Sequence, residues 1–103
     1  MTFEDVKLVA KANVYFDGKV SSRTFYTSEG ERKTLGFMLP GDYEFGTGAA
    51  EKMEVLSGVI EATLPGEDSP KVYGAGDYFE IPANSKYRAV VNTFADYLCS
   101  YMD

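Results

Sequence analysis

A single glutamate and a nearby arginine are the side chains of this sequence best suited to chemistry. Glu51 lies in the stretch GDYEFGTGAAEKMEVLSG, between an aromatic run and an apolar run, and Arg32 lies in GERKT. A carboxylate facing a protein interior is costly unless it is paired or hydrogen-bonded. A guanidinium matches the oxygens of an anion through its planar fork of N–H groups. Arg32 is therefore the first candidate for holding a small anion.

Several residues around these two offer further polar or aromatic groups. Lys33 and Thr34 flank Arg32 and, with backbone N–H groups, supply the donors of an anion cradle, to which Ser85 is a weaker addition. Arg88 is the competing anion ligand, although strand alternation directs its side chain away from the interior. Four aromatic side chains are candidate walls for a flat ring, and each one also has an ordinary reading as core: Tyr43, Phe45, Tyr87 and Tyr97.

Short strands separated by turns must position these groups. From Asn13 onward, runs such as DYFEIPA and KYRAVV are bounded by Gly, Pro, Asn or Asp. Asp17-Gly18 is a strong signal for a tight turn, and the polar tip SEGE separates two further strands. This number of short strands at regular spacing predicts an all-β fold, either an antiparallel sandwich or a closed barrel.

The alternation of apolar and polar residues predicts which side chains face the core. Three strands carry clear signals. The inward residues are expected to be Ile60, Ala62 and Leu64, then Phe79 and Ile81, then Tyr87, Ala89 and Val91.

The first twelve residues, MTFEDVKLVAKA, differ from the rest of the chain. Thr2 and Asp5 have the spacing of a capping box, and a weak apolar stripe follows. We expect residues 1–12 to form an extension, either a frayed arm or one short helix, and residues 13–103 to form the barrel.

The spacing of Gly, Glu and Pro resembles the two signature motifs of the cupin barrels. In the first motif a glutamate precedes a strand-ending glycine by seven positions, as Glu51 precedes Gly58. In the second, a glycine is followed by a proline six positions on and a histidine five beyond that, and here these positions are Gly76, Pro82 and Tyr87. The resemblance implies a single RmlC-like jelly roll.

The positions that carry metal ligands in cupins lack donors in this sequence. The chain contains no histidine, and the slots of the first motif fall near Phe45 and Thr47. A stable transition-metal site needs several N, S or O donors that converge on one point. Glu51 alone does not provide them, so we expect no metal.

A longer succession of segments resembles one family of single-domain cupins. YFDGKV, GERKTLGFMLPGDYEFGT, EKMEVLSGVIEATLPG, GAGDYFEIPANSKYR and YLCSYM together look like the small pyrimidine/purine nucleoside phosphorylases, over residues 15–102. The resemblance implies phosphorolysis, in which phosphate and a ribonucleoside give a free base and ribose 1-phosphate, with wide tolerance for the base. It also implies a cytoplasmic, metal-independent homodimer whose only co-substrate is inorganic phosphate, with no other cofactor.

Phosphorolysis assigns a role to each candidate. A phosphate must be held against C1′ of the ribose, for which Arg32 is preferred over Arg88. The sugar passes through an oxocarbenium-like state that nearby negative charge stabilises, as in glycoside hydrolysis. Glu51 could supply that charge, bind ribose hydroxyls, or protonate the base if burial raises its pKa. Thr47 could bind a ribose hydroxyl, and the aromatic walls would stack on the base.

Composition narrows the possible partners. The formal charge of −6 disfavours nucleic acids and anionic membranes, which attract basic proteins. No apolar run approaches the ~20 residues that span a bilayer. The single cysteine, Cys99, excludes an intrachain disulfide and reads as a small buried residue without chemistry. With no secretory leader apparent, the sequence predicts a reducing cytosol.

Three alternatives to the enzyme remain open. The loss of metal ligands and the lack of a clear acid/base pair also suit a non-catalytic barrel that binds a nucleoside, a sugar or another small metabolite. A metal-dependent cupin would require stoichiometric metal. A purely structural dimer would require a barrel mouth filled by its own side chains.

Overall fold

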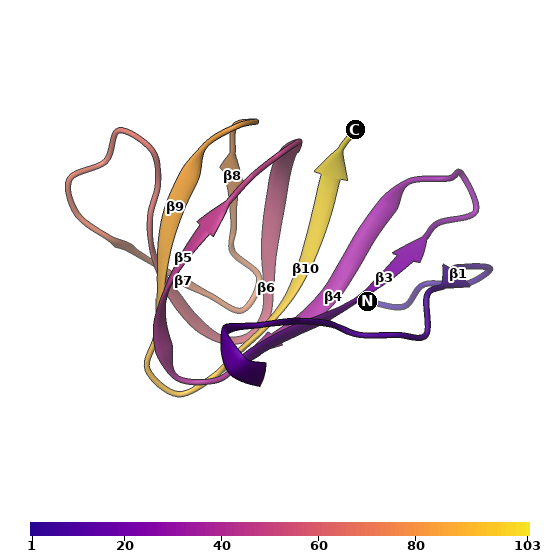
Figure 1. The fold of residues 1–103 in the computed structure, drawn as a ribbon, viewed down its shortest axis with the longest axis horizontal. Coiled ribbons are helices and arrows are strands. Elements are labelled where there is room, and N and C mark those ends of the chain that lie inside the picture. The colour runs from indigo at the N-terminus through magenta and orange to yellow at the C-terminus, as the bar shows by residue number, and fades with distance from the viewer.

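The computed structural model describes all residues 1–103, and nearly all of its regular structure is antiparallel strand (Figure 1). The elements in chain order are β1 (Lys7–Leu8), β2 (Asn13–Tyr15), the 3-10 turn η1 (Phe16–Gly18), β3 (Val20–Tyr26), β4 (Arg32–Met38), β5 (Gly41–Gly46), β6 (Ala50–Thr63), β7 (Lys71–Gly74), β8 (Tyr78–Ile81), β9 (Lys86–Val91) and β10 (Ala95–Met102). The all-β expectation is confirmed.

Strand β6 joins two hydrogen-bonded layers. The order of the strands is β1-β3-β4-β10-β6-β9-β5, with β2 on β3 and with β7 and β8 on β6. Residues 50–58 of β6 pair with β10 and, in part, β8, whereas residues 59–63 pair with β7 and β9. Figure 1 shows β3 and β4 on one side of β6 and β10, and β5 and β9 on the other. The curled sheet encloses the core as in a jelly roll.

Gly58 lies where β6 passes from one layer to the other. Its φ is +78°, and a Cβ at this position would press into the carbonyl group of Phe94. The pairing with β10 also shifts register between Asp96 and Tyr97. The runs KMEVLS and VIEATLP, which read as two strands in the sequence, therefore form one continuous strand bent at a position that only glycine fits comfortably.

The core confirms the alternation expected from the sequence. Phe79, Ile81, Tyr87, Ala89 and Val91 are each at most 5% exposed, and Ile60 and Ala62 are fully buried. Burial of a large apolar side chain stabilises the fold by roughly 1.5–3 kcal/mol. The remaining members of the main cluster are Val20, Met38, Tyr43, Met53, Val55, Ala95, Tyr97 and Cys99.

The helix considered for residues 1–12 is not formed. Lys7 and Leu8 instead pair with Tyr26 and Phe25 at the free edge of β3, and the N–H of Val9 donates to the carbonyl of Thr24 at 2.9 Å. The edge of β3 offers ready-made backbone partners. Of the weak apolar stripe, the Phe3 ring packs against Phe25 with centroids 4.9 Å apart, while Val6 and Val9 stay more than a third exposed.

Candidate functional site

A cavity of about 130 Å³ opens between the two layers around Glu51. Its lining includes Phe45 of β5 and Tyr87 of β9, together with residues of β2, β3, β4, β6 and β10. The lining residues are Tyr15, Ser22, Met38, Phe45, Gly46, Glu51, Met53, Tyr87, Tyr97, Cys99 and Tyr101.

Glu51 is a partly buried carboxylate at the start of β6. Its Oε1 lies 3.6 Å from the Sγ of Cys99, which donates to it. Burial raises the pKa of the Glu51 carboxyl, while the Cys99 hydrogen bond and the positive charge of Arg32 oppose that rise. Burial also raises the pKa of the Cys99 thiol to about 12, so the thiol is protonated at neutral pH and acts as a donor. Cys99 is buried as expected, and it also contacts the one carboxylate of the cavity.

Two buried tyrosines, Tyr87 and Tyr97, and the partly buried Tyr101 line the cavity with this carboxylate. Burial is the main cause that raises the pKa of Tyr87, Tyr97 and Tyr101 above the ordinary phenol range, and neighbouring titratable groups, Glu51 among them, add to the rise. All three therefore stay neutral and can both donate and accept hydrogen bonds. Tyr101 Oη lies 3.4 Å from Thr34 Oγ1, within hydrogen-bonding distance. The cavity thus combines flat apolar faces with neutral hydroxyl groups.

Arg32 lies at the rim of the same site. Its guanidinium carbon is 3.8 Å from the centroid of the Tyr101 ring, a cation–π contact. Tyr101 also pairs with Glu51 across β10 and β6, so the arginine and the carboxylate lie at the same level of the sheet. The Arg32 fork donates to both carboxylate oxygens of Asp103, each at 2.9 Å, and this hydrogen bonding raises the pKa of Arg32.

The neighbours of Arg32 divide between the two faces of β4. Thr34 faces inward with Arg32 and is 4% exposed. Lys33 lies on the opposite face, where its Nζ donates to Ser100 Oγ at 2.7 Å. Thr34 therefore stays a candidate for the site, whereas the structure separates Lys33 from the cavity.

Thr47 and Ser85 form a loop contact rather than part of the cavity. Thr47 Oγ1 donates to the carbonyl of Pro82 at 2.7 Å and accepts from the N–H of Ser85 at 2.9 Å. The hydroxyl of Ser85 is exposed and donates to the carbonyl of Ala83 at 3.1 Å. Thr47, which stands near the position of a metal ligand in cupins, therefore connects two loops through its hydroxyl group.

Arg88 and Tyr43 are also engaged elsewhere. Arg88 projects from the outer face, as its parity predicts, and forms a two-pronged ion pair with Asp42, with Nε 2.8 Å from Oδ1. Tyr43 is a core residue whose hydroxyl donates to the carbonyl of Leu39 at 2.6 Å. Of the two arginines considered, the structure places only Arg32 beside Glu51.

Two lining tyrosines, Tyr15 and Tyr101, were not among the residues selected from the sequence. Tyr101 had a usable signal, because the run YLCSY places it on the same face as Tyr97 and Cys99 at spacings of two and four. Tyr15 had none, since it precedes the Asp17-Gly18 turn and its position depends on the pairing of β2 with β3.

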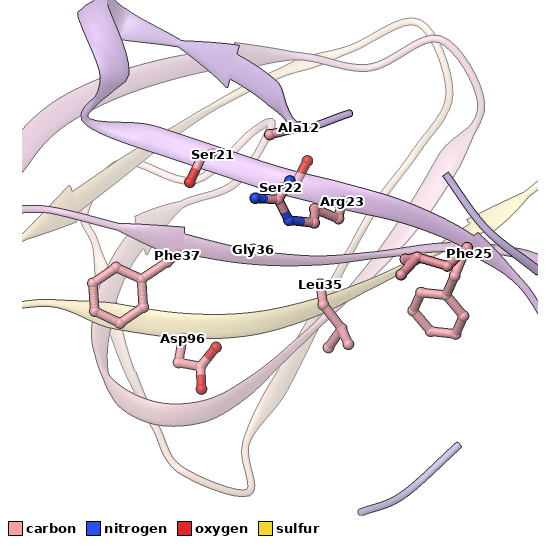
Figure 2. A pocket seen from close by; sticks show the side chains of 10 residues that line it. Ala12, Ser21, Ser22, Arg23, Phe25, Leu35, Gly36, Phe37 and Asp96 are labelled. Atoms are coloured by element: carbon pink, nitrogen blue, oxygen red, sulfur yellow. The ribbon is translucent and has the colours of Figure 1, made fainter. Parts of the chain in front are cut away.

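A larger, open hollow of about 340 Å³ lies on the outer face of β3, β4 and β10. Figure 2 shows Leu35, Phe37 and Asp96 among the side chains that line it. Its charged groups are Arg23 and Asp96, and Arg23 already donates to the carbonyl of Ala10 at 3.1 Å. It offers no buried titratable group, so the smaller cavity around Glu51 is the stronger candidate for chemistry.

Neither a metal cluster nor a membrane-spanning helix is found. No group of three or more His, Cys, Asp or Glu side chains is placed to hold a metal ion, and the cavity contributes only Glu51 and Cys99 as such donors. No helix has the length and apolar character needed to cross a membrane.

Related sequences agree on one family. Residues 10–101 match the family model described as pyrimidine/purine nucleoside phosphorylase. A protein of that name from Hydrogenovibrio crunogenus is 56% identical over 98% of this chain and 97% of its own length. Another of that name, from Citrifermentans bemidjiense, is 49% identical over 97% of each chain.

Solved structures share the fold. A protein of unknown function from Acinetobacter aligns with a TM-score of 0.94 and 32% identity over 97% of each chain. An RmlC-like cupin from Shewanella frigidimarina aligns with a TM-score of 0.69 over 98% of this chain and 86% of its own, and at 16% identity it supports the fold alone. The fold, the match over residues 10–101 and the relatives at about half identity together show that the chain belongs to the pyrimidine/purine nucleoside phosphorylase family.

Proposed function

We propose that this protein is a pentosyltransferase that catalyses the phosphorolysis of purine and pyrimidine ribonucleosides to a free base and ribose 1-phosphate. One observation carries the proposal: the carboxylate of Glu51, which forms no ion pair, lies in an aromatic cavity at the same level of the sheet as the guanidinium of Arg32. Phosphorolysis needs a site that binds an anion and, beside it, a group that stabilises positive charge on the sugar. These two residues provide both.

Arg32 is the proposed phosphate ligand. Its fork already binds a planar pair of oxygens, those of Asp103, with two hydrogen bonds of 2.9 Å. Phosphate presents oxygens with similar spacing and a greater negative charge, so it would compete for the same N–H groups. The Tyr101 ring beneath the guanidinium restricts its orientation.

Glu51 is proposed to act on the ribose. The bond between C1′ and the base nitrogen breaks with its electron pair leaving on the base, and positive charge develops on the sugar. An ionised carboxylate fixed in a partly dry site stabilises that charge without reorganising. The Cys99 thiol holds one oxygen of Glu51, which leaves the other free for a ribose hydroxyl.

The protons balance without a nucleophile on the protein. A phosphate oxygen forms the new bond to C1′. Hydrogen phosphate loses one proton in this step, and the departing base gains one. Positioning and electrostatics carry most of such a reaction. The reaction therefore needs no histidine, and the thiol of Cys99 serves only as a hydrogen-bond donor.

We also propose that the enzyme is independent of metal, accepts a broad range of bases and is located in the cytoplasm. The small number of metal donors in the cavity supports the first of these. The aromatic lining supports the second, because every base has a face on which a ring can stack.

Release of free base is the direct test. Purified protein, treated with a chelator and checked for metal, is incubated with inosine or uridine, with and without inorganic phosphate. We expect hypoxanthine or uracil only when phosphate is present, with equimolar ribose 1-phosphate. Binding of either nucleoside without turnover would instead identify a non-catalytic binding barrel, and activity that follows added metal would contradict metal independence.

A homodimer is also proposed. The outer face of the sheet exposes Leu35, Phe37 and Phe94 by about two fifths each, and the rings of Phe37 and Phe94 stack 5.7 Å apart. Contiguous exposed apolar side chains of this kind favour association. Sedimentation should give the mass of two chains, and Phe37→Glu should give the mass of one. A wild-type protein that sediments as one chain would contradict the proposal.

A further inference from the structure

The cavity around Glu51 is too small for a complete nucleoside. Its volume is about 130 Å³, whereas pockets for drug-sized ligands begin at about 300 Å³. A nucleoside bound with its ribose at Glu51 must therefore place most of its base against the residues at the edge of the cavity.

Strand register indicates the direction in which the base extends. Arg32 and Glu51 mark one end of the site. Tyr15 pairs with Val20, which pairs with Met38 at the opposite end of β4. Arg32 and Met38 are six positions apart, which is about 20 Å along the strand. Side chains that reach inward from both ends make the gap between them shorter than this. Phosphate attacks C1′ on the face away from the base, so phosphate at Arg32 directs the base toward Tyr15.

Tyr15 belongs to the cavity on one side and to solvent on the other. It lines the cavity, yet it is 49% exposed. On the same face of β2, the amide of Asn13 donates to Ser22 Oγ at 3.3 Å and to Thr24 Oγ1 at 3.1 Å, which fixes the orientation of the strand. Val14 points the other way and is 61% exposed.

The turn after Tyr15 has an unfavourable backbone that aromatic contacts hold in place. Phe16 and Asp17 both have positive φ values, 51° and 56°. This region is costly for residues other than glycine, and strain of this kind concentrates at functional sites. The Phe16 ring packs against Tyr43 at 4.9 Å and Phe45 at 5.4 Å between centroids. The turn thus anchors the N-terminal segment to β5, next to the cavity.

We propose that the ring of Tyr15 stacks on the nucleoside base and that its open side gives the enzyme its tolerance for both base classes. This inference rests on the proposed phosphorolysis. A two-ring purine can extend past Tyr15 into solvent without a clash, while a one-ring pyrimidine still covers the phenol. Stacking requires no particular pattern of hydrogen-bonding groups on the base.

Equilibrium binding of three probes to Tyr15→Ala tests the assignment. Uridine, inosine and ribose 1-phosphate are titrated by calorimetry, with Val14→Ala as the matched control on the same strand. Tyr15→Ala should weaken both nucleosides by roughly five- to hundredfold, inosine more than uridine, and should leave ribose 1-phosphate within about twofold. Val14→Ala should match the wild type for all three probes. Tyr15→Phe should retain nucleoside binding, because it keeps the ring.

Each other result overturns the assignment in a distinct way. Unchanged nucleoside affinity in Tyr15→Ala would remove Tyr15 from the base site and leave phosphorolysis standing. An equal loss for ribose 1-phosphate would show that Tyr15 only maintains the cavity. A wild-type protein that neither binds nor cleaves nucleosides would refute the proposed function and the base site together. If Tyr15→Ala unfolds at a lower temperature than the wild type, Tyr15→Leu is used instead, because it keeps the apolar cover without the ring. It should show the same loss of nucleoside binding with ribose 1-phosphate binding retained.

Discussion

The guanidinium of Arg32 and the carboxylate of Asp103 form a two-pronged ion pair, with Nε 2.9 Å from Oδ2 and Nη2 2.9 Å from Oδ1. The two residues are 71 positions apart, and the second is the last of the chain. This is the planar recognition that an arginine also gives to phosphate. The side-chain carboxylate of Asp103 therefore occupies the N–H groups that we assign to the co-substrate.

Removing the charge of Asp103 should strengthen phosphate binding. In Asp103→Asn, phosphate no longer displaces an ionised partner from Arg32, and we expect KM for phosphate to fall a few-fold, the modest effect usual for exposed ion pairs. The KM for inosine should not change. Asp68→Asn removes the same charge from an exposed loop and is the control. An equal effect in both variants would indicate net charge rather than competition.

Loss of Arg32 should impair the use of phosphate far more than nucleoside binding. Arg32→Ala removes a charged bidentate donor, and we expect kcat/KM for phosphate to fall roughly ten- to hundredfold. Steady-state rates at varied phosphate measure this, with inosine binding followed separately. Arg88→Ala serves as the matched arginine variant, since its guanidinium pairs with Asp42 on the outer face. A larger loss of kcat/KM for phosphate in Arg88→Ala would show that phosphate binds at Arg88 rather than at Arg32.

Neutralising Glu51 should lower turnover and stabilise the fold. Glu51→Gln keeps the shape but removes the charge, and we expect kcat to fall by roughly 10²–10³, as for other fixed charge-stabilising groups. The same change removes a partly buried carboxylate, so Tm at pH 8 should rise by a few degrees. Glu54→Gln, three residues further along β6, is the control for both measurements.

The sign of the pH dependence follows from the direction of the Glu51 pKa shift. Folding raises this pKa above its ordinary value of 4.5, so the native state holds the proton more tightly than the unfolded chain. The stabilisation is complete below about pH 4.5 and is lost as pH rises through the folded pKa. Urea denaturation should therefore show the advantage of Glu51→Gln growing from pH 4 to pH 8. An advantage independent of pH would contradict the assigned cause.

Adding a methyl group at Gly58 should destabilise the barrel. The positive φ and the contact with the Phe94 carbonyl leave no room for a Cβ. We expect Gly58→Ala to cost about 1–3 kcal/mol in the free energy of unfolding. Gly48→Ala is the control, because a Cβ there meets nothing within 4 Å. Equal midpoints in urea for the two variants would show that β6 bends without help from Gly58.

Much of the fold could be predicted from the sequence because its signals are local. Alternation at a period of two placed Phe79, Ile81 and Tyr87 in the core, and it directed Arg88 outward. The Asp17-Gly18 turn marked a strand break, whereas Gly58, which the sequence indicated as a strand end, is a bend within β6. For residues 1–12 the sequence left a frayed arm or one short helix open; no helix forms, and the strand pairing with β3 was missed because that edge lies far along the chain and a local pattern does not reveal it.

The sequence by itself determined a histidine-free antiparallel barrel, singled out Glu51 and left Tyr97 as either a wall for a ring or a core residue. The tertiary structure decided which groups meet that carboxylate. Cys99 lies 48 positions from Glu51, and Thr47 is taken up by contacts with Pro82 and Ser85. Such contacts depend on which strands pair and in what register, which is a property of the whole sheet, whereas alternation reports only the face of a single strand.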